Sequence, residues 1–167
     1  MYEDKYPYFR TLTAFRWTPI FNHIEPCDIL IDSLNFMISN DRLRLYGYVI
    51  MIDHIHMIAK GENLKGEINK LKSYTARKVI DWAKSRNQTN LLQQLKIDDI
   101  DDRDFKLWEA GFKPVQITNS EIMKSWLNYI HNNPVKKGFV INPEDWLRSS
   151  ALNYAGDGGL LDIVVDW

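Results

Sequence analysis

The stretch Tyr46–Lys60, YGYVIMIDHIHMIAK, decides the fold of this 167-residue chain. With the residues just before it, it predicts two strands separated by a turn near residues 51–53. In the second strand, His54 and His56 are two residues apart, so both imidazoles project from the same face. Two neutral imidazoles at this spacing can bind one divalent cation. Paired histidines on a strand are also common as structural residues, so the pair alone leaves both readings open.

The flanking segments extend this hairpin into a larger pattern. Aromatic and β-branched residues predict a strand at Tyr8–Trp17, which would place Arg10 and Arg16 on one face. Apolar spacing predicts helices over residues 28–40 and 64–83, and a short strand is expected within residues 106–117. A last helix follows, so the order of elements is that of an α+β protein. This order suits an antiparallel sheet with helices mainly on one face.

The last predicted helix has clear boundary signals. Thr118 followed by Glu121 matches a capping box, and Pro134 disfavours helical geometry at Asn133, where we expect the helix to end. On a helical wheel, Tyr129 and Asn133 lie one turn apart at the edge of the apolar stripe. They therefore point in the same direction. Taken alone, Tyr129 is best explained as a core-edge residue and Asn133 as a helix-ending residue.

Composition limits the class of protein. The length fits one domain, and 45% hydrophobic residues are enough for a core. A single cysteine, Cys27, excludes an internal disulfide. No apolar run is long enough to span a membrane, and the first ten residues lack the hydrophobic region of a secretory signal. We therefore expect a cytoplasmic protein.

Charge is segregated along the chain although the net charge is only −1. Residues 64–86 contain seven basic and two acidic residues, which is typical of either a phosphate-facing helix or a solvated helix face. Residues 98–104 contain five acids and one arginine, and we interpret this run as an exposed linker or a charge complement. Aromatic residues make up 13% of the chain, which fits either a well-filled core or stacking platforms for bases.

Four segments, in this order, carry a family resemblance: RTLTAFRW, YGYVIMIDHIHMIAK, LKSYTARKV and WLNYIHNNPVKKGFV. Together they resemble the single-tyrosine HUH transposases, which are the small insertion-sequence enzymes of the IS two-hundred type and the REP-associated tyrosine transposases. The resemblance runs from about Tyr8 to Tyr154. It implies a single HUH transposase domain over residues 1–167, with a core at about 8–141 and a C-terminal tail at 142–167. The implied fold is a ferredoxin-like or RRM-like antiparallel sheet.

The resemblance also implies roles for individual residues. His54, His56 and Asn133 match the ligands of a divalent metal, Mg²⁺ or Mn²⁺, and Tyr129 matches the nucleophile. The implied activity is a DNA transposase that cleaves and rejoins hairpin-containing single-stranded DNA through a 5′-phosphotyrosine intermediate. Such an enzyme would be associated with the nucleoid. Further candidates for DNA contact are Arg10, Arg16, Lys65, Lys72, Tyr74 and Arg77.

Some features depart from the family pattern and keep alternatives open. Residues 51–53 read Met-Ile-Asp where many members have Met-Pro-Asn, so Asp53 either points away from the histidines or reaches the metal. We expect His131 to be exposed or to face DNA. The main alternative is a non-catalytic protein that binds single-stranded or hairpin DNA on the same fold. A replication initiator is a weaker one, because such proteins often carry two tyrosines in the active helix. Both a monomer and a homodimer with shared sites are compatible with the sequence.

Overall fold

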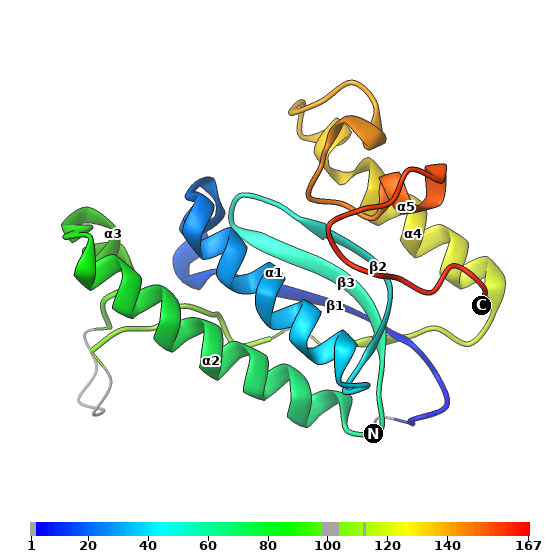
Figure 1. Ribbon diagram of the computed structural model, residues 1–167, viewed down its shortest axis with the longest axis horizontal. Coiled ribbons are helices and arrows are strands. Elements are labelled where there is room, and N and C mark those ends of the chain that lie inside the picture. Colours follow the sequence, from blue (N-terminus) through cyan, green and yellow to red (C-terminus); the bar gives the residue numbers. More distant parts are fainter. Residues whose placement is uncertain (1–2, 98–103, 112) are drawn as a thin grey trace.

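The computed structural model describes residues 3–97, 104–111 and 113–167 (Figure 1). The acidic run at residues 98–104 lies, except for Asp104, outside the described residues. The strands are β1 Tyr8–Thr13, β2 Arg44–Ile50, β3 His54–Lys60 and β4 Val115–Gln116. The helices are α1 Ile24–Ser39, α2 Leu64–Ser85, α3 Thr89–Leu95, α4 Ser120–Lys136 and α5 Ala151–Ala155. Short 3₁₀ turns occupy Phe15–Trp17, Ile20–Asn22 and Pro143–Asp145.

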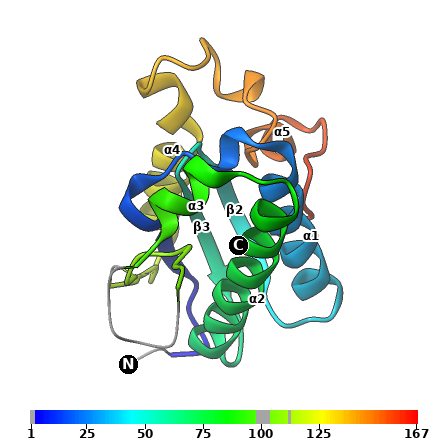
Figure 2. The ribbon, with the colours of Figure 1, turned by 90° about the vertical axis from the view of Figure 1, so that its left-hand side faces the viewer.

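The four strands form one antiparallel sheet in the order β2-β3-β1-β4. This order, with α1 between β1 and β2 and α2 between β3 and β4, is the ferredoxin-like arrangement that the sequence predicted. The predicted hairpin is also confirmed, with β2 ending at Ile50 and β3 beginning at His54. Figure 2 shows β2 and β3 running side by side behind α2. The histidine strand β3 is therefore an inner strand, held on both sides.

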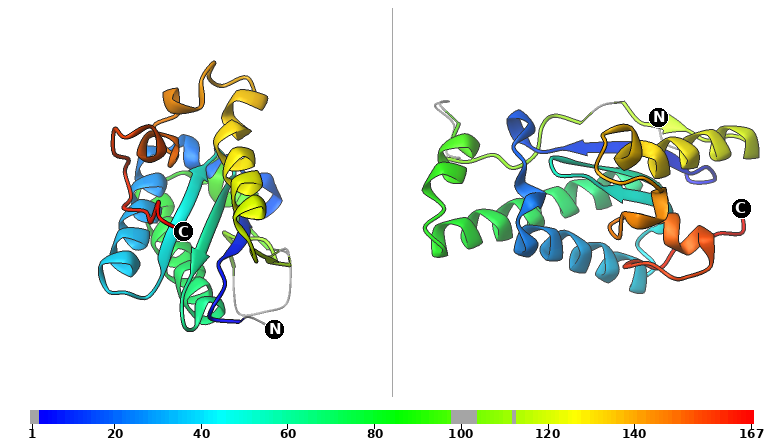
Figure 3. Two further views of the ribbon diagram at one scale, coloured as in Figure 1. Left: turned by 90° about the vertical axis from the view of Figure 1, so that its right-hand side faces the viewer. Right: turned by 90° about the horizontal axis from the view of Figure 1, so that it is seen from above.

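The two faces of the sheet are covered differently. Helices α1 and α2 pack on one face over the larger core, whereas α4 lies on the other face (Figure 3). The C-terminal segment contributes to both layers, with Leu161 in the α1–α2 core and Tyr154 against the α4 layer. Alternation along β3 assigns its side chains to these two layers: Ile55 and Met57 belong to the α1–α2 core and Ile58 belongs to the α4 layer. His54 and His56 have the same parity as Ile58. The histidines therefore face α4.

Strand β1 is shorter than predicted. It ends at Thr13, and Arg16 and Trp17 adopt positive φ angles of 54° and 55° within a 3₁₀ turn. The expectation that Arg10 and Arg16 share one strand face is therefore wrong. The Ala14 N–H donates to the Asp53 carbonyl (2.8 Å), which continues the β1–β3 register by one residue. The next N–H, that of Phe15, donates to the Leu107 carbonyl (2.7 Å), so the chain leaves its pairing with β3 at this point.

Helix α4 differs from the prediction at both ends. Its N-cap is Asn119, whose side chain accepts from the Ile122 N–H at 2.9 Å, and not Thr118. The helix also continues past Pro134 to Lys136. Proline lacks only one backbone N–H, and the last turn is completed by bonds from Lys137 to Asn133, from Gly138 to Val135 and from Phe139 to Pro134. Asn133 is thus a helical residue, one full turn after Tyr129.

The C-terminal segment closes the outer edge of the sheet. Trp146 Nε1 donates to the Ile50 carbonyl at 3.0 Å, and the Tyr154 hydroxyl donates to the Tyr46 carbonyl at 2.8 Å. The Val164 N–H adds a bond to the Leu45 carbonyl at 2.8 Å. These contacts satisfy backbone groups of the edge strand β2 and cover it. Among the described residues, no helix is both long and apolar enough to cross a bilayer.

Candidate active site

The two histidines are the centre of the candidate site. His54 and His56 pair across the sheet with Thr13 and Thr11 of β1, and each is only 6% exposed. Their ring centroids are 4.6 Å apart. The strand geometry therefore brings the two imidazoles together on the face that α4 covers, as their spacing predicted.

Each imidazole is oriented through the same ring nitrogen. His54 Nδ1 donates to Asp53 Oδ1 at 2.5 Å, and His56 Nδ1 shares a hydrogen bond with the Thr11 hydroxyl at 2.7 Å. Because both bonds use Nδ1, the other ring nitrogen, Nε2, is available in each histidine to bind a cation. Burial, reinforced by the charge of nearby His54, lowers the pKa of His56 to about 3, so this ring is neutral at physiological pH. A neutral imidazole held by a partner at its other nitrogen is the usual form of a metal ligand.

Asp53 lies in the bend before β3, so its side chain does not follow the strand alternation. Its carboxylate reaches back to His54. The Asp53 side chain therefore does not point away from the histidines. Nor does it complete a cluster of three acidic, histidine or cysteine residues that could hold a metal within the described part of the chain. Asp53 acts on the site through His54, whose ring it orients.

Tyr129 is brought to the histidines by α4. Its ring centroid lies 5.2 Å from that of His56, and 37% of the residue is exposed. Behind it, Phe9 of β1 and Trp126 of α4 stack at 3.9 Å and fix the helix against the sheet. Lys136 Nζ lies 5.8 Å from the tyrosine ring centroid and adds positive charge to this surface. Tyr129 and His56 belong to the same chain, so one chain brings the tyrosine and the histidines together.

Asn133 lies one turn after Tyr129 on α4 and is 8% exposed. Its Oδ1 is buried and has no hydrogen-bond partner among the described residues. A buried carbonyl oxygen without a partner is costly, and an absent ligand is one reason for such an oxygen in a folded protein. Two imidazole nitrogens and one amide oxygen make a donor set that fits a divalent metal such as Mn²⁺ or Mg²⁺.

The predicted DNA contacts of α2 lie away from this site. Lys65, Lys72, Tyr74 and Arg77 are on α2, which covers the sheet face opposite to the histidines. Lys72 is partly buried, donates to the Glu109 carbonyl at 2.7 Å and has a pKa lowered by burial first and by nearby positive charge second. Arg77 lies over the ring of Tyr74 at 5.7 Å. The structure therefore does not bring the basic helix to Tyr129.

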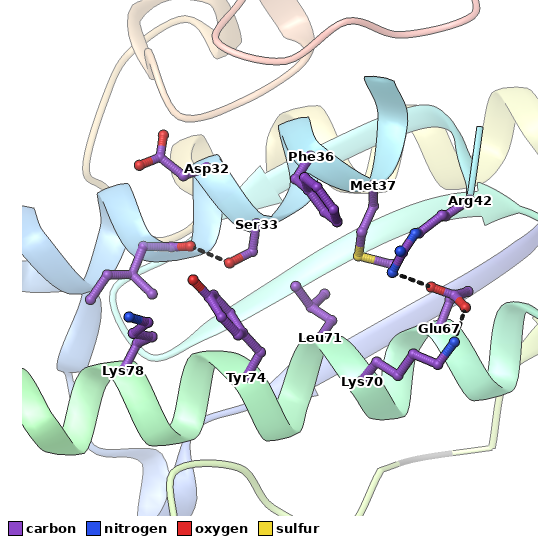
Figure 4. Close-up of a pocket in the computed structure, with 11 residues that line it drawn as sticks. Asp32, Ser33, Phe36, Met37, Arg42, Glu67, Lys70, Leu71, Tyr74 and Lys78 are labelled. Atoms are coloured by element: carbon purple, nitrogen blue, oxygen red, sulfur yellow. Dashed lines mark hydrogen bonds and ion pairs between the residues drawn. The ribbon is translucent and has the colours of Figure 1, made fainter. Parts of the chain in front are cut away.

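Two other features lie on the α1–α2 side. Arg10 has the parity of Tyr8 and Leu12, which pack in the α1–α2 core, and its charge acts on Lys72. A cavity of about 580 Å³ opens between α1 and α2, where Phe36 and Tyr74 face each other across it (Figure 4). Neither histidine lines this cavity.

Sequence reasoning was wrong about His131. It is not an exposed or DNA-facing residue, because its Nε2 lies 2.9 Å from the Ser150 hydroxyl and its ring packs at 5.3 Å from Tyr154. Burial lowers the pKa of His131 to about 4. The expectation failed because the helical wheel could not show that the C-terminal segment folds back over this side of α4.

Trp17 is a residue of the site that the sequence did not single out. It is 55% exposed, and its ring centroid lies 5.9 Å from that of His54. Arg16, one of the predicted DNA contacts, precedes it in the same turn. Because the sequence predicted an extended strand through residue 17, it did not predict that Trp17 would lie beside His54. The signal present in the sequence was the unusual run FRWTP, in which two aromatic residues and an arginine precede a proline.

Comparison with known proteins supports the fold. No family model matches the chain, and no curated protein matches it. Among solved structures, the chain is similar to the REP-associated tyrosine transposase bound to a REP hairpin, with a TM-score of 0.68 and 17% identity over 100% of this chain and 87% of that one. A "putative transposase" from Deinococcus radiodurans R1 shares 19% identity over 75% of this chain and 88% of that one, at a TM-score of 0.44 that carries no further weight. The chain thus has the fold of a REP-associated tyrosine transposase.

Proposed function

We propose that this protein is a single-tyrosine DNA transposase that cuts and rejoins single-stranded DNA through a covalent phosphotyrosine. The observation that carries the proposal is the position of Tyr129 beside His56, with its ring half-open to solvent and its helix held against the histidine strand. The shared fold with a tyrosine transposase supports it. A nucleophile next to a pair of oriented imidazoles that can bind a metal is an arrangement that suits phosphoryl transfer.

The chemistry assigned to this chain is a reversible transesterification. The phenol oxygen of Tyr129 attacks the phosphorus of a phosphodiester, and the bond between phosphorus and the 3′ oxygen breaks. The phenol loses its proton as the new bond forms, and the leaving 3′ oxygen gains one. The products are a 5′-phosphotyrosine and a free 3′-hydroxyl. Attack by a second 3′-hydroxyl reverses the step and joins two strands, so no external energy source is needed.

The proposed metal ligands are His54, His56 and Asn133. When bound, Mg²⁺ or Mn²⁺ would polarise the scissile phosphate and offset the negative charge that develops on its oxygens. Asp53 and Thr11 hold the two rings so that both Nε2 atoms stay available. Lys136, near Tyr129, attracts the phosphate backbone to the same surface.

The proposed substrate is single-stranded DNA that adjoins a hairpin. The structural neighbour is bound to a REP hairpin, and an unpaired strand is the form of DNA whose bases can be splayed and stacked on aromatic rings. The exposed aromatic side chains at this site suit that form. The basic residues of α2 lie on the opposite face, and their contact with the duplex part of a hairpin stays a prediction.

A covalent-trapping assay tests the proposal. The protein is incubated with Mn²⁺ and labelled single-stranded oligonucleotides that cover the flanks of its own gene, and a denaturing gel then shows whether DNA remains attached. We expect an adduct that is absent in Tyr129→Phe and in His54→Ala. Tyr74→Phe is the matched control, because it removes an exposed tyrosine hydroxyl on α2 but keeps the ring with which Tyr74 would contact DNA, so it should retain the adduct.

The other outcomes distinguish the alternatives. An adduct that persists in Tyr129→Phe would refute the assignment of the nucleophile. Tight hairpin binding without any adduct in the unmodified protein would favour the non-catalytic DNA-binding protein. Phenylalanine keeps the ring of Tyr129 against Phe9 and His56, so loss of the adduct in this variant would report the hydroxyl and not the packing.

A further inference from the structure

The turn at Arg16–Trp17 holds two consecutive side chains in an uncommon backbone conformation. Both residues have positive φ angles, 54° and 55°, which bulky residues rarely adopt. Glycine would adopt this conformation without strain, but this chain has an arginine and a tryptophan here. A strained turn persists only when its surroundings impose it, and such turns cluster at functional sites.

Hydrogen bonds from two directions impose this turn. The Arg16 N–H donates to Glu109 Oε1 at 2.8 Å, and the Trp17 N–H donates to the Ala14 carbonyl at 2.9 Å. The Ala14 N–H in turn donates to the carbonyl of Asp53, the residue whose carboxylate orients His54. The backbone of Ala14 therefore links Trp17 to Asp53, and so to the histidine pair.

The result is an exposed tryptophan ring at the His54 end of the site. The Trp17 ring meets the His54 ring edge-on, at 5.9 Å and an interplanar angle of 76°, while 55% of the residue faces solvent. Tyr129 lies at the opposite end, beyond His56. Trp126, by contrast, is half-buried and stacks on Phe9, so it packs the helix against the sheet. Within the described residues, Trp17 belongs to neither core cluster, and its ring contact is with His54.

We propose that Trp17 is the stacking platform for an unpaired base next to the scissile phosphate, on the His54 side of the site. This inference rests on the proposed function. Stacking on an aromatic face holds a single-stranded base without requiring a particular sequence. A ring that is fixed before DNA arrives loses little conformational freedom on binding. Trp17 is thus a positioning residue, which aligns the phosphate with Tyr129 and takes no part in bond making.

The test separates stacking from general packing. In a Tyr129→Phe background that binds without cutting, we compare Trp17→Leu and Trp17→Phe by fluorescence anisotropy with a labelled single strand that spans the cleavage point. Leucine keeps apolar bulk without an aromatic face, and we expect it to weaken binding about tenfold, whereas phenylalanine should stay within about threefold. The slope of affinity against salt should be the same in both variants, because no phosphate contact is lost.

A second measurement locates the base. 2-Aminopurine is placed in turn at each position around the cleavage point, and its fluorescence should be quenched at one flanking position by the unmodified ring and not by Trp17→Leu. Trp167→Ala is the matched control, because Trp167 is an exposed tryptophan at the C-terminus, where it bonds to Tyr154, and it should change neither result. Equal binding and equal quenching in Trp17→Leu would overturn the inference while the adduct of the trapping assay stands. Absence of both adduct and binding in the unmodified protein would instead refute the proposed function and this inference with it.

Discussion

Asn133 offers the sharpest test of the metal site, because its replacement should raise stability and lower metal binding at the same time. The Oδ1 atom of Asn133 is buried without a hydrogen-bond partner among the described residues. A buried, unpaired carbonyl of this kind costs about 1–3 kcal/mol. Asn133→Leu removes that cost and keeps a side chain of similar size at this buried position.

The magnitude follows from these numbers. We expect a net gain of about 1–2 kcal/mol in the metal-free protein, after some loss from imperfect packing. For a chain of this length, that gain raises the unfolding midpoint by about 2–8 °C. Metal should act in the opposite direction. At an Mn²⁺ concentration about 100 times the dissociation constant, the unmodified protein should gain about 2.7 kcal/mol, and the variant should gain much less.

The assay is thermal unfolding followed by circular dichroism, once in EDTA and once in excess Mn²⁺. Asn132→Leu is the matched control, because Asn132 is the next residue along α4 and, among the described residues, its side chain bonds to the backbone and side chain of Asn128. It should leave the metal-induced shift intact. A lower midpoint of Asn133→Leu in EDTA, together with an undiminished shift in Mn²⁺, would refute the reasoning that Asn133 is a ligand.

Three further predictions follow from the same structure. Asp53→Ala should weaken Mn²⁺ binding about 10- to 100-fold in a calorimetric titration, because it removes the carboxylate that orients His54; unchanged affinity would contradict that role. A mixture of Tyr129→Phe and His56→Ala proteins should not regain cleavage, because Tyr129 lies 5.2 Å from the histidine of its own chain, and recovery on a gel would show sharing between chains. Burial raises the pKa of Cys27 to about 11, so the unfolded thiol ionises first and the free energy of unfolding should fall between about pH 9 and 11, by up to about 2 kcal/mol. This fall should be smaller in Cys27→Ala, and an equal fall in a denaturant titration would contradict it.

Local patterns were sufficient to predict the sheet and the centre of the site. The period of two places His54 and His56 on one face whatever the rest of the chain does, and the period of 3.6 places Tyr129 and Asn133 together on a helix. The ferredoxin-like order followed from the sequence of elements and from the family resemblance. What these patterns could not show is which face of the sheet the last helix would cover. That depends on long-range packing of Phe9 against Trp126.

The errors have a common physical cause. The strand predicted through Trp17 ends at Thr13, because the Phe15 N–H bonds to the distant Leu107 carbonyl and the Arg16 N–H bonds to the Glu109 side chain. His131 is half-buried because the segment that carries Ser150 folds back against it. In each case, a contact between segments far apart in sequence overrode a sound local preference. The residues affected lie around the candidate site, where such overrides are expected.

The same long-range contacts set the distance between Tyr129 and the histidines, the proposed nucleophile and metal ligands. Gly47 of β2 lies where a Cβ atom would come within 2.5 Å of a Leu127 methyl group, so α4 rests directly on the backbone of the sheet. Ser150 reinforces this contact, because its hydroxyl accepts from the Tyr48 N–H and lies 2.9 Å from His131 on α4. A Cβ atom at position 47 would require the Leu127 side chain to move. The position of Tyr129 against His56 is therefore a property of the β2–α4 contact and of the C-terminal segment that holds it, and not of the histidine motif alone.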